Sequence, residues 1–168
     1  MDHRKHFADI HRRPQLYGLD GSYHDYCTYL LGVDAGNDGG LLTGFKESLV
    51  PRVGTGDNLT WTSLVLYLAF PGRTSGWHDE AAGDGRQVAV DLLFTLLDEF
   101  LETRSRARGT AAIFAGYLAW REAQPWARPA SLGQVVPADQ DRGGEQAGHD
   151  DLPGDQQRAR AGHLPEVQ

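Results

Sequence analysis

Apolar residues recur at helical spacing along most of the first 124 positions. The clearest case is residues 86–103, where apolar side chains return every three or four positions and the opposite side is polar. Its apolar positions are Val88, Leu92, Leu93, Leu96, Leu97, Phe100 and Leu101. Residues 59–70 are apolar on nearly every side, which is typical of a central, buried helix.

The same spacing predicts the other helices. They are expected at residues 2–12, 23–35, 41–53 and 110–122. Ser22 is a good N-cap for the second of these, and Asn58 is the expected N-cap of the helix at 59–70. Pro14 should end the first helix, because the residue before a proline avoids helical dihedral angles. Pro51 should kink or end the helix that contains it.

Residues 71–85 contain four glycines and a proline, and we expect an exposed loop there. No run of residues alternates between apolar and polar positions in the manner of a strand. The chain is therefore predicted to be all-α, a compact bundle of five or six helices with short connections, followed by a disordered C-terminal tail.

The tail is predicted from composition. Residues 125–168 contain six residues that are Leu or Val and lack Ile, Phe and Tyr, while Gly, Pro and Gln fill 17 of the 44 positions. Such a segment buries too little apolar surface to offset its loss of conformational entropy. We therefore expect a helical domain at 1–124 and a disordered, low-complexity tail at 125–168. A native linker from a high-GC genome and a frameshifted extension would both have this composition.

Charge limits the classes of partner. The net charge is −7, and residues 20–102 hold thirteen acids against four bases. An acidic domain disfavours nucleic acid, whose phosphates require clustered cations, and would favour a basic partner, although solubility alone accounts for the sign. The longest uninterrupted apolar run, Leu64–Phe70, is too short to span a bilayer, and no signal peptide is evident. We expect a cytoplasmic protein that binds neither membranes nor nucleic acid.

The glycine-rich stretch "GVDAGNDGGLLTGF" at 32–45 could be a calcium-binding or phosphate-binding loop. Phe45 occupies the position where a calcium loop starting at Asp34 needs a bidentate Glu, and also the position where a phosphate loop needs Lys. The simplest reading is a connection between two helices, with Gly36, Gly39 and Gly40 at positive φ.

Candidate metal ligands and nucleophiles are few. His3 and His6 are one helical turn apart and could share a metal, but His11 lies on another face, so ordinary surface histidines are the favoured reading. Cys27, the only cysteine, alternates with core-facing residues and is predicted to be a buried, inert thiol. No catalytic residue, metal site or cofactor is assigned.

The helix predicted at 86–103 carries a pattern of acidic residues that could have a function. On the polar side of residues 86–103, Asp91, Thr95, Asp98 and Glu102 follow one another at spacings of four, three and four residues, and Glu99 lies beside them, which makes a continuous acidic stripe. An ordinary solvated helix face would explain them. The functional alternative is a docking surface for a basic protein partner, since complementary charge speeds encounter.

Four stretches carry a family resemblance: "RRPQLYG", "SYHDYCTYLLGVDAG", "GGLLTGFKESLV" and "NLTWTSLVLYLAFP". Over residues 10–105 the chain resembles a group of small actinobacterial proteins, some of which are similar to immunity proteins that neutralise polymorphic toxins by binding them. The resemblance implies an inhibitor of a protein toxin. Its motifs are structural, so it implies no functional residue.

Three functions follow from these observations, in order of preference. The first is a helical binding protein, and specifically an immunity-type inhibitor, which makes an enzyme the less favoured class. The second is a small enzyme or ligand-binding protein whose pocket lies between helices and is lined by Arg13, Tyr17, Tyr26 and Trp61. The third is a structural subunit without independent activity. The sequence does not specify an oligomeric state.

Overall fold

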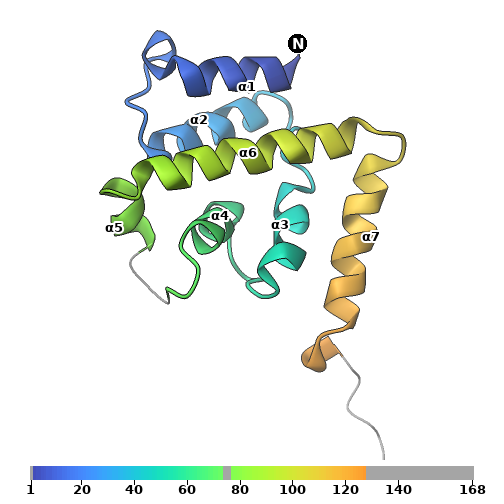
Figure 1. Cartoon of the computed structure of the whole chain (residues 1–168). Helices are drawn as coiled ribbons and strands as arrows, with labels where there is room; N and C mark the ends of the chain where they lie inside the picture. The colour runs from blue at the N-terminus through green and yellow to red at the C-terminus, as the bar shows by residue number, and fades with distance from the viewer. Residues whose placement is uncertain (1, 74–76, 128–168) are drawn as a thin grey trace, which may run out of the picture. The chain divides into compact units, whose positions relative to one another are not determined.

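The computed structural model describes residues 2–73 and 77–127, most of which lie in helices (Figure 1). The α-helices are α1 (His3–Arg12), α2 (Tyr23–Ala35), α3 (Phe45–Val53), α4 (Trp61–Ala69), α5 (Trp77–Ala82), α6 (Arg86–Ser105) and α7 (Gly109–Glu122). Short 3-10 helices occur at Pro14–Tyr17 and Pro125–Ala127. These residues include no strand, so the predicted all-α class is confirmed.

The segment between α4 and α6 and the N-cap of α4 differ from the predictions. The expected loop at 71–85 contains the six-residue helix α5, which is too short for apolar periodicity to reveal. The N-cap of α4 is Thr60 rather than Asn58, because the Thr60 hydroxyl accepts a hydrogen bond from the Ser63 amide at 3.3 Å. The predicted N-cap Ser22 is confirmed by the hydrogen bond that its hydroxyl accepts from the Asp25 amide at 3.2 Å.

The glycine-rich stretch connects α2 to α3, and its dihedral angles correct part of the prediction. Gly36 caps α2 at φ −67°, in the right-handed region, and Gly40 is not at positive φ either. Positive φ occurs at Gly39 (67°) and at Gly44 (92°), the N-cap of α3. Asp34, the first ligand position of the rejected calcium loop, accepts a hydrogen bond from the Leu42 amide at 2.8 Å and so fixes the connection.

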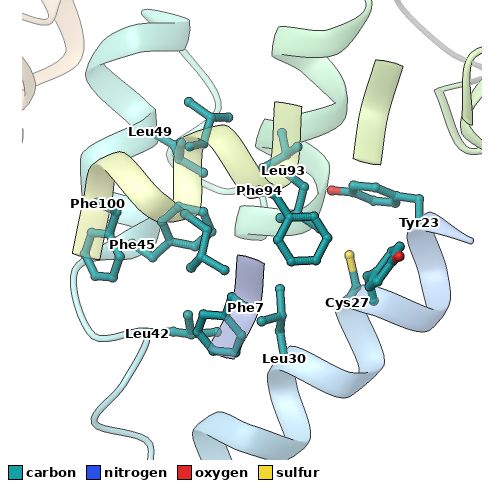
Figure 2. Packing of buried hydrophobic residues seen from close by; sticks show 14 of the residues in the cluster. Phe7, Tyr23, Cys27, Leu30, Leu42, Phe45, Leu49, Leu93, Phe94 and Phe100 are labelled. Atoms are coloured by element: carbon teal, nitrogen blue, oxygen red, sulfur yellow. The ribbon is translucent and has the colours of Figure 1, made fainter. Parts of the chain in front are cut away.

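The core surrounds α6, which contacts each of the other α-helices. Figure 2 shows the centre of this cluster, where the rings of Phe45 and Phe100 lie 5.1 Å apart between their centroids. Leu64, Val65 and Leu66 of α4 are fully buried, as predicted for a central helix. Each fully buried Leu, Val or Phe side chain stabilises the fold by about 1.5–3 kcal/mol.

At the end of the helical domain, residues 125–127 form a 3-10 helix, and the ring of Trp126 lies 6.4 Å from that of Trp120. The helical part therefore extends three residues beyond the predicted boundary at 124. The rest of the predicted tail, residues 128–168, lies outside the described residues. Within the described ranges, no helix is long and apolar enough to cross a bilayer.

Candidate partner-binding face

The two sides of α6 have opposite characters. One side is buried in the core, and the other carries the predicted acidic stripe. The exposed fractions of the four acidic side chains are 56% for Asp91, 51% for Asp98, 49% for Glu99 and 46% for Glu102. The structure therefore places all four on the surface of one helix, about half accessible to solvent.

α1 runs antiparallel to α6 along this stripe. Phe7 and Ile10 are the buried residues of α1, and its polar residues Arg4 and His11 reach the acids of α6. Arg4 pairs with Asp98, and His11 pairs with Asp91. His11 lies seven residues after Arg4 on α1, and Asp91 lies seven residues before Asp98 on α6. Seven residues are about two helical turns, so the two antiparallel helices stay in register between these pairs. We call the surface formed by these facing helices the α1–α6 seam.

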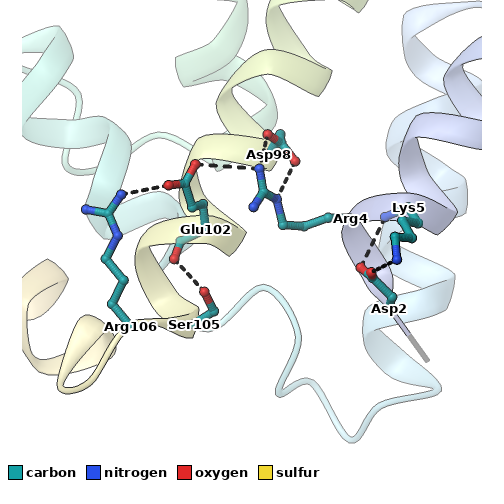
Figure 3. A network of polar contacts seen from close by, with 7 residues as sticks. All are labelled: Asp2, Arg4, Lys5, Asp98, Glu102, Ser105 and Arg106. Atoms are coloured by element: carbon teal, nitrogen blue, oxygen red, sulfur yellow. Dashed lines mark hydrogen bonds and ion pairs between the residues drawn. The ribbon is translucent and has the colours of Figure 1, made fainter.

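Arg4 makes the most complete contact of the seam (Figure 3). Its Nε and one terminal nitrogen donate to the two carboxylate oxygens of Asp98, each at 2.6 Å, and Glu102 lies 3.5 Å from the same guanidinium. A bidentate pair of this kind fixes both position and orientation. The hydrogen bond from Arg4 holds the pKa of Asp98 below its ordinary value.

The other acids of the stripe also have partners within the chain. Arg52 of α3 donates to Glu99 at 2.6 Å, and Arg106, just after α6, donates to Glu102 at 2.7 Å. Asp91 accepts a hydrogen bond from Gln87 at 2.7 Å, and its other contact is with His11, at 3.0 Å. These partners were not predicted, and they make the stripe far less negative than its four carboxylates suggest.

Apolar surface adjoins the charged residues. A groove of about 600 Å³ follows the α1–α6 seam, with Phe7, Phe94 and Leu97 among its apolar lining and Asp91 and Asp98 among its charged lining. A second groove, of about 570 Å³, lies beside the start of α1 and the end of α6. Both grooves are lined in part by Arg4 and Leu101, so they adjoin one another along the seam.

His11 links the charged and apolar parts of the groove. Its ring stacks on Phe94 with a centroid separation of 4.3 Å and an interplanar angle of 10°, while its Nε2 lies 3.0 Å from the Asp91 carboxylate. This role of His11 was not predicted, because Asp91 lies 80 residues away in the sequence and His11 was interpreted as an ordinary surface histidine. The stacking on Phe94 and the contact with Asp91 together fix the orientation of the ring.

A separate polar cluster forms around Asp9, which sequence reasoning overlooked. Tyr17 donates a hydrogen bond to the Asp9 carboxylate at 2.8 Å, Arg13 also donates to it, and Arg12 does so at 2.9 Å. These hydrogen bonds lower the pKa of Asp9 to about 2, and the one from Tyr17 has the largest effect. Arg12 and Arg13 lie three and four residues after Asp9, a helical spacing that would have revealed the pairs.

The alternative pocket predicted from Arg13, Tyr17, Tyr26 and Trp61 is not assembled. Arg13 and Tyr17 meet at Asp9, but Tyr26 is buried with its ring edge-on to Phe94. Trp61 packs against Phe45, with 5.5 Å between ring centroids. The four side chains therefore occupy three different environments.

The remaining candidates for chemistry are engaged in packing. His6 lies 3.1 Å from the Tyr29 hydroxyl, and His3 stacks on Phe7. Within residues 2–73 and 77–127, no three histidine, cysteine or carboxylate side chains are grouped to hold a metal. Cys27 is buried as predicted, and burial raises the pKa of its thiol to about 12, so the thiol is protonated at neutral pH.

Similarity to known proteins adds no further constraint on the site. Comparison with protein-family models, with curated proteins and with solved structures gave no match.

Proposed function

We propose that this protein is a helical binding protein, an inhibitor of the immunity type, and that it binds its protein partner through the α1–α6 seam. The observation that carries the proposal is the coincidence, along one seam, of half-exposed carboxylates and an apolar groove of about 600 Å³. Protein interfaces combine these elements, with apolar anchors buried at the centre and polar groups at the rim.

The internal ion pairs are compatible with such an interface. The side chains of Arg4 and Arg52 are 41% and 44% exposed, and ion pairs this accessible contribute little to stability. A basic side chain of the partner can therefore replace Arg4 at Asp98 or Arg52 at Glu99 with little loss. An aromatic or aliphatic side chain of the partner would occupy the groove beside Phe94.

Binding to the product of the adjacent gene tests the proposal. The chain is produced together with that product, the complex is captured, and the affinity is compared between the natural protein and D98N/E102Q. We expect the double variant to bind at least tenfold more weakly, mainly through slower association, and the loss to shrink at high salt.

The matched control is D79N/D84N, which removes two exposed carboxylates that do not line the groove. Thermal melts establish that both double variants are folded. Equal affinities of the two double variants would exclude the seam as the binding surface. If the adjacent gene product is harmless when produced alone and does not bind the chain, the inhibitor function is wrong.

A further inference from the structure

The outer face of α7 is apolar even though it is exposed. α7 packs against α3 and α6, and its inward side chains Ile113, Tyr117 and Trp120 belong to the core or pack against it. In Figure 1, α7 lies at the edge of the helical domain. The opposite side of the helix, about 180° away at 100° per residue, carries an exposed row of residues. They are Arg108, Ala111, Ala115, Leu118 and Glu122, which we call the α7 outer row.

The spacing of the α7 outer row is that of a coiled-coil seam. Its members follow one another at intervals of three, four, three and four residues, so Ala111, Ala115, Leu118 and Glu122 stay in line along the helix. Arg108 precedes them as the N-cap of α7, in the left-handed conformation. Leu118, near its centre, has 49% of its surface exposed. A helix that is apolar on both its inner and outer sides is normally buried on both. Among residues 2–73 and 77–127, no element covers the outer row, and its five members are all exposed.

The charges at the two ends of the row specify which partner fits. Arg108 precedes the apolar residues and Glu122 follows them, and within the described residues neither has an ion-pair partner. When two such helices lie antiparallel, Arg108 of each copy meets Glu122 of the other. The midpoint of the row is Ala115, which would lie on the two-fold axis. Leu118 would then lie against the small side chains near Ala111 of the other copy.

From this self-complementarity we propose that two copies of the chain associate through antiparallel α7 helices. The antiparallel orientation also aligns the helix dipoles favourably. A helix of 14 residues is only about 21 Å long, so the interface is small compared with those of stable dimers. We expect dissociation constants on the order of 10–100 µM. This inference does not depend on the proposed function.

Sedimentation of the full chain over a range of concentrations tests the proposal. The natural protein should shift from monomer to dimer with increasing concentration, and L118E should remain a monomer. The matched control is L31E, which places the same charge at a leucine of α2 that is 50% exposed. L31E should dimerise like the natural protein, and thermal melts establish that both variants are folded.

Charge exchange tests the orientation. R108E alone and E122R alone should each weaken dimerisation several-fold, because like charges then meet at both ends. Dimerisation should return in the double variant R108E/E122R, and also when the two single variants are mixed. A natural protein that stays monomeric at high concentration would overturn the proposal. So would a double variant that stays as weak as the single ones, or an L31E variant that is as defective as L118E.

Discussion

α6 and α7 are consecutive helices rich in apolar residues, yet their surroundings differ. Eight of the 20 residues of α6 are buried, whereas two of the 14 residues of α7 are buried. Each acid on the outer side of α6 has a partner from another part of the chain, while the charges of the α7 outer row have none within the described residues. Apolar content alone therefore does not decide burial, because burial also depends on how many helices surround the element.

The largest difference should appear when one large side chain is removed from each helix. Phe100 of α6 is 2% exposed, and F100A should lower the free energy of unfolding by about 3–5 kcal/mol, because it leaves a cavity beside Phe45. Leu118 of α7 is half exposed, and L118A should change the free energy of unfolding by less than about 0.5 kcal/mol. Urea unfolding at low protein concentration measures both values. Similar losses would contradict the contrast between the two helices.

Two glycines of α7 should respond in opposite directions. A Cβ added at Gly109 would lie 2.0 Å from the backbone oxygen of Thr103, so G109A should destabilise the turn between the helices by about 1–3 kcal/mol. A Cβ at Gly116 would meet nothing within 4 Å, and G116A should stabilise the protein by about 0.5–1 kcal/mol through helix propensity. Thermal melts of the two variants provide the comparison, and a G109A protein as stable as the natural one would mean that the turn adjusts freely.

The ion pairs of α6 should contribute less to the free energy of unfolding than its core does, and only at pH values at which the acids are ionised. Arg4 holds the pKa of Asp98 below its ordinary value of 3.8, so the pair stabilises the fold above that pH. Its contribution is lost as the pH falls through the lower pKa of the folded state. R4Q should thus be slightly less stable than the natural protein at pH 7, with a smaller difference in acid.

K5Q is the control for this experiment, because Lys5 lies on the same helix but pairs with Asp2. Unfolding measured from pH 7 down to pH 2 should show converging curves for R4Q and the natural protein. NMR titration should show a higher pKa for Asp98 in R4Q and an unchanged one in K5Q. A constant difference at every pH would mean that Arg4 acts through packing rather than charge.

The smallest effect is expected from removing residues 128–168. Their composition predicts no buried contacts, so a chain ending at Ala127 should melt within about 2 °C of the full chain. This variant also bears on the comparison of α6 with α7, because it tests whether residues 128–168 cover the outer row of α7. A decrease of about 5 °C or more would correspond to roughly 1 kcal/mol and would show that the removed residues pack against the helical domain.

The fold was predictable where local periodicity is strong. The predicted helix at 86–103 corresponds to α6 at Arg86–Ser105, because five turns of repeating apolar residues leave little ambiguity. Leu41 and Leu42 were wrongly included in the next predicted helix. Both are buried, at 7% exposure each, but they lie in the connection before Phe45. Their spacing reflects packing against the core rather than helical geometry.

Of the candidate site, the acidic residues of α6 were predictable, but their partners from other parts of the chain were not. The alignment of the acids follows from spacing within a single helix, but Arg4 is 94 residues from Asp98, and Arg52 is 47 residues from Glu99. Local patterns do not indicate which helices become neighbours, so these partners could not be assigned. Asp9 is the contrary case, because its arginine partners lie within one turn.

The pairing of α1 with α6 also affects the order in which the chain folds. The two helices are joined by contacts that span 80 and 94 residues of sequence. At synthesis rates of about 5–20 residues per second, α1 leaves the ribosome roughly 4–19 s before its partner is made. During that interval, the side chains of Phe7 and Ile10 have no α6 to cover them. α1, which is synthesised well before α6, thus completes its packing only after α6 has been made.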